Sequence, residues 1–355
     1  MTPPEKTIRL LSRAAAALAV AGWTTLAGAA GSLNALVWCD HTDAGFLKGF
    51  TAKTGIKVNV KDYEGTGTAL ALLEQSKPGS WDVFVVDSTD VRRVVARGLL
   101  APLDAKDFPM ADIPEIVRLP EYHVVDGKMY AIPEKFGYNA VAYDKKKVTP
   151  EQARDVTTLW NPAFKGKVGI YDYYLPIISQ IAIALGKKPQ SLTEADLPAI
   201  REKLKAMRAN AAMVGDVVTS QTAIATGQVA IVAGGGEYLV AGLSREKPHL
   251  DWVLPDVGGV RWQQAIGVFA ASKKQKEATA FVQYVLSPEG QAKLATSSCY
   301  WGMPANSKAS LNDKQKKTLR WDEQAKFLAK SYPYLSPTES FDKAMQDLWA
   351  EVLQK

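Results

Sequence analysis

The stretch from Leu33 to Thr68 constrains the fold of this chain more than any other. Its beginning, Leu33 to Trp38, is a short apolar run of the kind that forms a strand buried on both faces. The polar residues after it can cap a helix that ends at Gly55, where a left-handed residue is favoured. Apolar and polar side chains then alternate from Ile56 to Val60, as in a second strand. Strand, helix and strand within about thirty residues form a βαβ unit with parallel strands.

The rest of the chain repeats this alternation of strands and helices. Trp81 to Val86 predicts another buried strand, and Val168 to Tyr171 and Val229 to Ala233 predict two more in the second half. In open sheets of parallel strands, ligands lie beyond the carboxyl ends of the strands. In the opening unit these ends are Trp38 to His41 and Tyr63 to Thr68. The predicted fold class is therefore α/β.

Residues 1–30 have the features of a cleavable signal peptide. Lys6, Arg9 and Arg13 form a basic leader, a short apolar run follows, and small residues near Ala29 permit cleavage. The apolar run is too short to span a bilayer, and it carries no polar stripe that would make it an amphipathic first helix. Export to the periplasm is therefore expected.

Charge, length and cysteine content limit the classes of fold and function. The chain carries a formal net charge of +6, but its Lys and Arg residues are scattered, which argues against nucleic-acid binding. Residues 31–355 exceed a comfortable single core, so two domains are expected. Three histidines without HxxxH or CxxC spacing argue against a zinc site. Cys39 and Cys299 can pair in an exported chain or stay as buried thiols, and the sequence leaves both possibilities open.

Seven segments follow one another along the chain: FTAKTGIKVNV, SWDVFVVDSTDV, KMYAIPEKFGYN, TTLWNPAFKGKV, TGQVAIV, PDVGGVRWQQA and FVQYVLSPEGQ. In this order they resemble the periplasmic polyamine-binding proteins of ATP-driven importers, within family 1 of the extracellular solute-binding proteins. The resemblance implies a two-lobed periplasmic binding protein fold of type II, with the ligand in the cleft between the lobes. It also implies discontinuous lobes, the first made of 31–137 with 266–309 and the second of 138–265 with 310–355.

The resemblance further implies a binding function without chemistry. The protein is expected to be the substrate-binding component of an ABC transporter, not an enzyme, and to need no cofactor or metal. Its expected partners are a small-molecule solute and a membrane permease. No nucleic acid is expected, and the protein is expected to act as a monomer.

Candidate ligand-binding residues come from the same resemblance: Trp38, Cys39, Asp40, His41, Ser88, Thr89, Tyr173, Glu237, Trp262 and Gln264. Asp40 and Glu237 are the acids expected to face an ammonium group across the cleft, although each can instead cap a helix. Gln264 stands where the polyamine binders carry an aspartate, and Tyr173 stands where they carry an acid. Because a long polycation needs a carboxylate at each amine, the expected solute is a smaller amine or a zwitterion.

Three other functions fit parts of the sequence. The residues from Gly65 to Thr68 open a helix with hydroxyls and backbone N–H groups, which suits a small anion such as a carboxylate or phosphonate. Tyr173 and Tyr174 resemble the paired tyrosines of iron-carrying relatives, which makes ferric iron an alternative. Cys39 to His41 contains the residue types of a thiol hydrolase, but neighbours on an extended stretch point to opposite sides. The binding functions therefore rank above hydrolysis.

Overall fold

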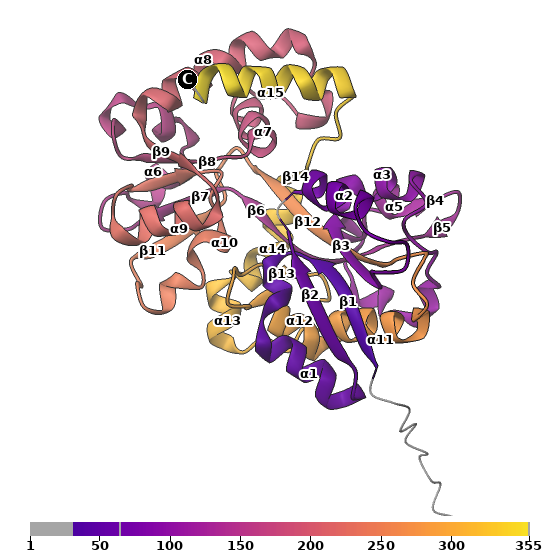
Figure 1. Cartoon of the computed structure of the whole chain (residues 1–355). Helices are drawn as coiled ribbons and strands as arrows, with labels where there is room; N and C mark the ends of the chain where they lie inside the picture. The colour runs from indigo at the N-terminus through magenta and orange to yellow at the C-terminus, as the bar shows by residue number, and fades with distance from the viewer. Residues whose placement is uncertain (1–30, 64, 354–355) are drawn as a thin grey trace, which may run out of the picture.

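The βαβ unit expected at the start of the chain is present in the computed structural model, which describes residues 31–63 and 65–353 (Figure 1). Strand β1 (Ser32–Val37) pairs in parallel with β2 (Lys57–Asp62), and α1 (Ala44–Thr54) connects them. The two strands therefore end at the same edge of the sheet, as the sequence predicted.

Local side chains explain where α1 begins and ends. The Asp43 side chain accepts hydrogen bonds from the backbone N–H groups of Gly45 and Phe46, so it satisfies donors that the first turn leaves unpaired. Gly55 follows the last turn with φ 75°, a left-handed conformation that glycine adopts without steric cost. Both signals were readable from the sequence.

The first sheet has the strand order β13-β6-β12-β3-β1-β2, with β14 paired along β12. Its further strands are β3 (Val83–Asp87), β6 (Ile132–Asn139), β12 (Gly259–Val268), β13 (Met303–Pro304) and β14 (Ser331–Pro333). The helices and hairpin around it are α2 (Thr66–Glu74), α3 (Val91–Ala96), α4 (Glu115–Arg118), α5 (Pro120–His123), β4 (Val124–Val125), β5 (Lys128–Met129), α11 (Gln275–Leu286) and α12 (Pro288–Ala295). Because β12 lies antiparallel between β3 and β6, a late segment of the chain forms the middle of this sheet.

The long strand β12 differs from the sequence-based prediction. In the sequence, the apolar runs from Val260 to Trp262 and from Val268 to Ala271 favour two separate short strands, but the structure has one strand from Gly259 to Val268. The polar residues Gln263 and Gln264 interrupt the pattern, but both are buried and their side chains form hydrogen bonds inside the protein. The amide N–H groups of both side chains find partners, although the two side-chain oxygens form no hydrogen bond within the protein.

The second sheet has the order β11-β7-β10-β8-β9. Its strands are β7 (Val141–Asp144), β8 (Val168–Tyr171), β9 (Ala211–Gly215), β10 (Ile231–Ala233) and β11 (Leu250–Val253). The helices of the second half are α6 (Pro150–Arg154), α7 (Tyr174–Ala184), α8 (Leu197–Asn210), α9 (Val217–Thr226), α10 (Glu237–Val240), α13 (Asp313–Thr318), α14 (Gln324–Ala329) and α15 (Glu339–Leu353). The C-terminal α15 packs against α7 and α8, so the end of the chain belongs with the second lobe (Figure 1).

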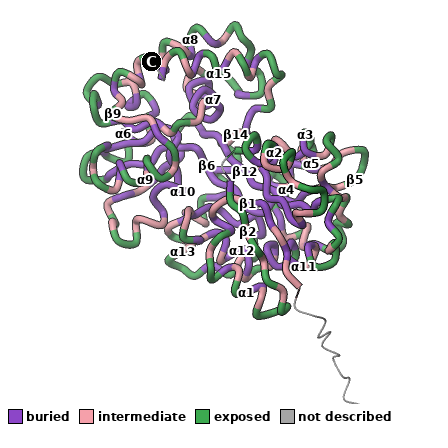
Figure 2. The backbone as a smooth tube through the Cα atoms, viewed as in Figure 1, coloured by how far each residue is buried: buried purple, intermediate pink, exposed green. Residues whose placement is uncertain are grey.

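The chain passes between the two sheets three times, after β6, before β12 and after β14. The lobe boundaries predicted at residues 137 and 265 fall within β6 and β12, which are both strands of the first sheet. Every residue of these two strands is buried, and Figure 2 shows them running through the interior of the molecule. Side chains on the crossing strands therefore face either the core or a space between the lobes.

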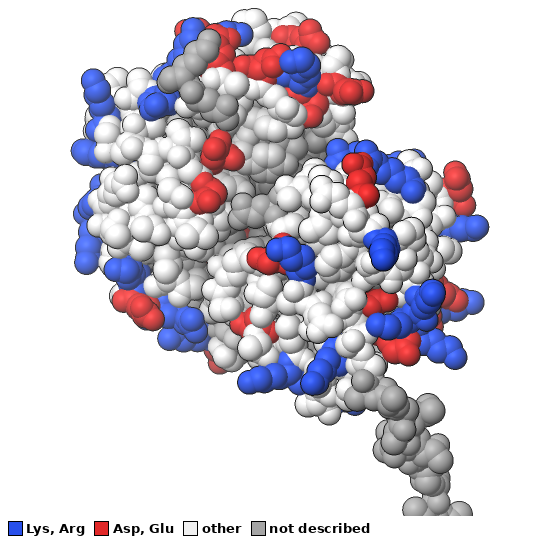
Figure 3. Space-filling view, viewed as in Figure 1, with Lys and Arg blue, Asp and Glu red and all other residues white. Residues whose placement is uncertain are grey.

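Two further observations concern the outside of the protein. The signal peptide predicted at residues 1–30 lies outside the described residues. Within residues 31–63 and 65–353, no helix is both long enough and apolar enough to cross a membrane. On the visible face in Figure 3, Lys and Arg side chains are spread over both lobes rather than gathered in one patch.

Candidate ligand-binding site

A cavity of about 210 Å³ lies between the two lobes. Trp38, Tyr63 and Asp87 line it at the carboxyl ends of β1, β2 and β3. From the second lobe Tyr171 lines it at the end of β8, and Trp262 reaches it from the crossing strand β12. The cavity therefore lies where the parallel strands of both sheets end, which is the position expected for a ligand in this class of fold.

Aromatic side chains form a large part of the cavity wall. Eight of the nineteen described lining residues are Trp or Tyr. Six of them form a chain of neighbouring rings, with centroids 5.7 to 6.3 Å apart and planes at 62 to 90°: Tyr334, Tyr173, Tyr171, Tyr238, Trp262 and Tyr300. We call these six rings the aromatic belt. Edge-to-face packing of this kind stabilises the rings, and their faces attract cations.

The charged groups of the cavity are all acidic. The described lining residues include Asp62, Asp87, Asp172 and Asp216 and contain no Lys, Arg or His. Asp62, Asp172 and Asp216 are exposed at the rim. Asp172 accepts a hydrogen bond of 3.0 Å from the Trp349 indole, and Asp216 caps α9. These two rim acids therefore already have partners within the protein.

Asp87 differs from the other three acids because it is partly buried, whereas they are exposed. It is the last residue of β3, and within the described part of the chain no hydrogen bond or ion pair reaches its carboxylate. Burial, with a further contribution from the negative charge of Asp90, raises the pKa of Asp87 to about 8. A carboxylate in this position lacks a cation that would neutralise it.

The structure brings half of the ten predicted ligand-binding residues to the cavity: Trp38, Cys39, Tyr173, Trp262 and Gln264. Ser88 and Thr89 instead line a separate cavity of only about 10 Å³. Asp40, His41 and Glu237 line neither of these cavities. The acids selected from the sequence are therefore not the acids that the cavity presents.

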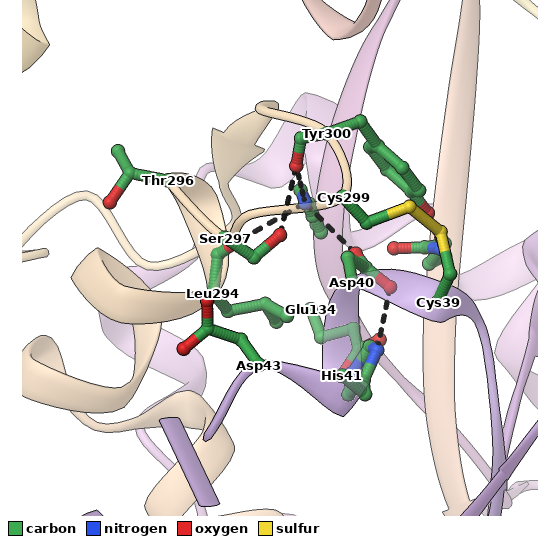
Figure 4. Close-up of polar contacts among 12 residues, drawn as sticks. Cys39, Asp40, His41, Asp43, Glu134, Leu294, Thr296, Ser297, Cys299 and Tyr300 are labelled. Atoms are coloured by element: carbon green, nitrogen blue, oxygen red, sulfur yellow. Dashed lines mark hydrogen bonds and ion pairs between the residues drawn. A yellow bond between two sulfur atoms is a disulfide. The ribbon is translucent and has the colours of Figure 1, made fainter. Parts of the chain in front are cut away.

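Asp40 and His41 belong to a buried network of charges (Figure 4). Asp40 accepts a hydrogen bond of 2.9 Å from the Lys135 ammonium and lies 2.8 Å from Nδ1 of His41. His41 Nε2 in turn lies 2.9 Å from Glu134. Lys135 also donates to the backbone carbonyls of Leu294 and Tyr300, so the network joins β6 to the segments on either side of it.

The pKa values of the network follow from its pairing. Burial alone opposes the charge of Asp40, but the charges of Lys135 and His41 outweigh it and lower the pKa of Asp40. Burial likewise opposes the charge of His41, but Glu134 and Asp40 raise its pKa to about 10. Because His41 is then cationic and ion-paired, neither Asp40 nor His41 is available to a solute.

The Glu237 carboxylate stabilises the crossing strand β6 through hydrogen bonds from its backbone. Its carboxylate accepts hydrogen bonds of 3.1 and 3.2 Å from the backbone N–H of Tyr138 in β6, and burial raises its pKa to about 8. A Cβ atom at Gly137 would lie 1.7 Å from Glu237 and 2.4 Å from the Trp262 ring. Only glycine therefore fits between these two side chains, and Glu237 holds the strand that carries the cavity wall.

A disulfide joins Cys39 and Cys299, which are 260 residues apart, with their Cα atoms 6.0 Å apart. The sequence left this pairing open, and the structure decides it. Both cysteines line the cavity, and their neighbours Trp38 and Tyr300 do so as well. The disulfide therefore ties together two segments that supply aromatic walls. It also removes Cys39 as a free thiol, which the hydrolase alternative requires.

The anion and iron alternatives find little support in the geometry. Gly65 lines the cavity and α2 begins at Thr66, but no basic side chain accompanies them among the described lining residues. Tyr173 faces the cavity, whereas the Tyr174 hydroxyl donates to Asp342 in α15. The two tyrosines thus belong to different environments. No group of three or more His, Cys, Asp or Glu side chains is placed to hold a metal ion in the described part of the chain.

Residues 46–321 match the family model of the bacterial extracellular solute-binding proteins. The match covers well over half of the chain, so the protein belongs to this family. The family and the architecture confirm the predicted α/β fold with two lobes and a ligand cleft between them.

Individual relatives are similar to this chain over most of its length. The spermidine/putrescine-binding periplasmic protein 1 of Haemophilus influenzae is 26% identical over 261 residues, which are 72% of this chain and 71% of the relative. The corresponding Escherichia coli protein is 24% identical over 262 residues, 73% of each chain. A spermidine/putrescine substrate-binding protein structure from Streptococcus pneumoniae superposes with a TM-score of 0.76 at 19% identity, covering 91% of this chain and 99% of that one.

Proposed function

We propose that this protein is the substrate-binding component of an ABC importer and that its solute is a small cationic amine. The observation that carries the solute class is Asp87, an unpaired carboxylate in a cavity with aromatic walls and no basic lining residue among those described. The relatives named above, which bind spermidine and putrescine by their names, support the same class. The proposal includes export to the periplasm through residues 1–30 and delivery of the solute to a membrane permease.

The cavity fits one buried cation better than several. Each buried ammonium needs a carboxylate, because an unpaired charge away from water is costly. Asp87 is the acid in the deep part of the cavity, whereas Asp172 and Asp216 lie at the exposed rim and already have partners within the protein. A solute with one ammonium at Asp87 and a polar or charged end at the rim matches this distribution. The absence of a basic group from the described lining favours an amine over a zwitterion.

Mass spectrometry of the small molecule that co-purifies with the protein tests this proposal. The protein is purified without a refolding step, denatured, and the released molecule is identified. We expect an amine, and we expect the same amine to raise the melting temperature of protein that was first stripped of ligand. Release of a carboxylate or phosphonate without an amino group would contradict the proposal. In that case the Gly65 to Thr68 turn becomes the better candidate site.

Affinity for a cationic solute should fall about tenfold for each pH unit below about pH 8. The pKa of Asp87 in the empty site is about 8, so at lower pH the carboxyl group is protonated and must release its proton before it can pair with a cation. Above pH 8 the affinity should level off until an amine solute itself loses its charge. His123, behind Ser88, has a pKa lowered to about 4 by burial, so it stays neutral in this range.

Calorimetry between about pH 6 and pH 9, in two buffers with different ionisation enthalpies, measures both the affinity and the proton release. We expect nearly one proton to be released per bound cation near neutral pH. Constant affinity over this range, with no proton release, would show that Asp87 is already ionised or does not contact the solute.

A further inference from the structure

The walls and hydrogen-bonding groups of the cavity carry information about the solute beyond its charge. We propose that its buried cation is a methylated ammonium, either tertiary or quaternary, and that the cavity selects it over a primary ammonium. This inference rests on the proposed function, because it concerns the same cavity and the same carboxylate.

The first support is the aromatic lining. The rings of the aromatic belt follow one another edge to face, with planes at 62 to 90°, so they are held at steep angles to one another around the space. Trp38 and Tyr63 add a second pair of rings, with centroids 5.4 Å apart. A methylated ammonium spreads its charge over its methyl groups and contacts ring faces without giving up hydrogen bonds. Aromatic cages bind such cations for this reason.

The second support is the small number of free amide and carboxylate acceptors. Asn139 donates to the Gly234 carbonyl and the Tyr238 hydroxyl, and its oxygen accepts from the Tyr334 hydroxyl at 2.7 Å. The amide oxygen of Asn139 is therefore already used within the protein. Gln264 is the other lining amide, and its oxygen is buried and forms no hydrogen bond within the protein.

Asp87 is the remaining carboxylate or amide side chain in the deep part of the described lining. It lies opposite Gln264 in the register of β3 and β12. A primary ammonium brings three N–H donors, and a single carboxylate does not satisfy three donors in different directions. A buried donor without an acceptor is costly. A tertiary ammonium has one N–H group for Asp87, and a quaternary ammonium has none, so both avoid this cost while the carboxylate still neutralises their charge.

Calorimetry with two matched pairs of probes tests the inference on the ligand-free protein. The pairs are ethanolamine with choline, and putrescine with (4-aminobutyl)trimethylammonium. The members of each pair differ only in the methylation of one nitrogen. We expect the methylated member of at least one pair to bind about tenfold more tightly than its primary counterpart.

A variant locates the selectivity in the aromatic wall. Tyr173→Leu removes one ring of the belt and should weaken binding of the methylated probe by roughly 3- to 30-fold. It should change the affinity for a primary amine much less. The matched control is Tyr174→Leu, because this neighbouring tyrosine faces Asp342 instead of the cavity. Circular dichroism melting curves of both variants show whether each is folded.

The outcomes separate this inference from the proposed function. Equal or tighter binding of the primary members, or an equal loss in both Tyr173→Leu and Tyr174→Leu, would overturn the inference and leave the amine function standing. Binding of no amine from either pair, and of no amine that co-purifies, would overturn both. Preference for the methylated members that Tyr173→Leu abolishes would establish the selectivity.

Discussion

Replacing Asp87 with asparagine should weaken the binding of a cationic solute by about 2 to 5 kcal/mol, measured by calorimetry near pH 8.5 where the wild-type carboxyl group is ionised. Asparagine keeps the size of the side chain and removes its charge. The buried cation then faces an aromatic wall with no carboxylate within the deep part of the described lining. Since truncating one member of a desolvated charge pair leaves the other uncompensated, the loss should appear mainly as faster dissociation.

The same substitution should leave the empty protein as stable as the wild type or more stable. Asp87 has no partner among the described residues of the empty protein, and burial raises its pKa to about 8, so its ionisation opposes folding. Asp126→Asn is a matched control, because Asp126 is exposed in the turn between β4 and β5 at φ 49°, a conformation that asparagine tolerates. Unchanged solute affinity in Asp87→Asn, with full affinity in the control, would remove Asp87 from the proposed site.

Lys135→Met should lower the free energy of unfolding by about 3 to 5 kcal/mol. The ammonium group of Lys135 is fully buried and donates to Asp40 and to two backbone carbonyls, of Leu294 and Tyr300. Methionine fills similar space but leaves the network with one negative charge in excess and both carbonyls without this donor. Urea denaturation, followed by circular dichroism, measures the loss.

Two comparisons make this second prediction specific. Lys128→Met changes an exposed lysine in β5 and should alter stability by no more than about 0.5 kcal/mol. Adding Asp40→Asn to Lys135→Met should recover part of the lost stability, because it removes the charge that Lys135 balanced. If Lys135→Met kept the stability of the wild type but lost solute binding, Asp40 and Lys135 would belong to the ligand site, contrary to the arrangement seen here.

Much of the fold could be predicted because its signals are local. An apolar run that stops at a polar residue predicted β8 with the bounds that it has, and the spacing of Phe341, Met345 and Leu348 in the sequence fits one helical face, which is buried in α15. Asp43 and Gly55 act through atoms of their own helix ends, so their effect is readable without knowing the rest of the molecule. The order of seven segments gave the family, which in turn gave two lobes and a cleft.

The candidate site could be predicted only in part. Trp38, Tyr173 and Trp262 line the cavity as expected, because the ends of strands and the crossing segment must face the cleft. The acids selected from the sequence, Asp40 and Glu237, do not line the cavity, and Asp40 and Asp87 look alike in the sequence. Each is an acid just after a buried apolar run. The position of Asp87 as the last residue of a central strand was the available signal.

The sequence by itself determined the βαβ elements, their caps, the two-lobed α/β class and the edge of the sheets where a ligand lies. Only the tertiary structure decided which acid is free, because Lys135, which neutralises Asp40, lies 95 residues further along the chain. It likewise joined Cys39 to Cys299 across 260 residues and placed Gln264 beside Asp87 by strand register. Such contacts depend on how distant segments pack, and no local sequence pattern shows whether a buried charge is paired with an opposite charge.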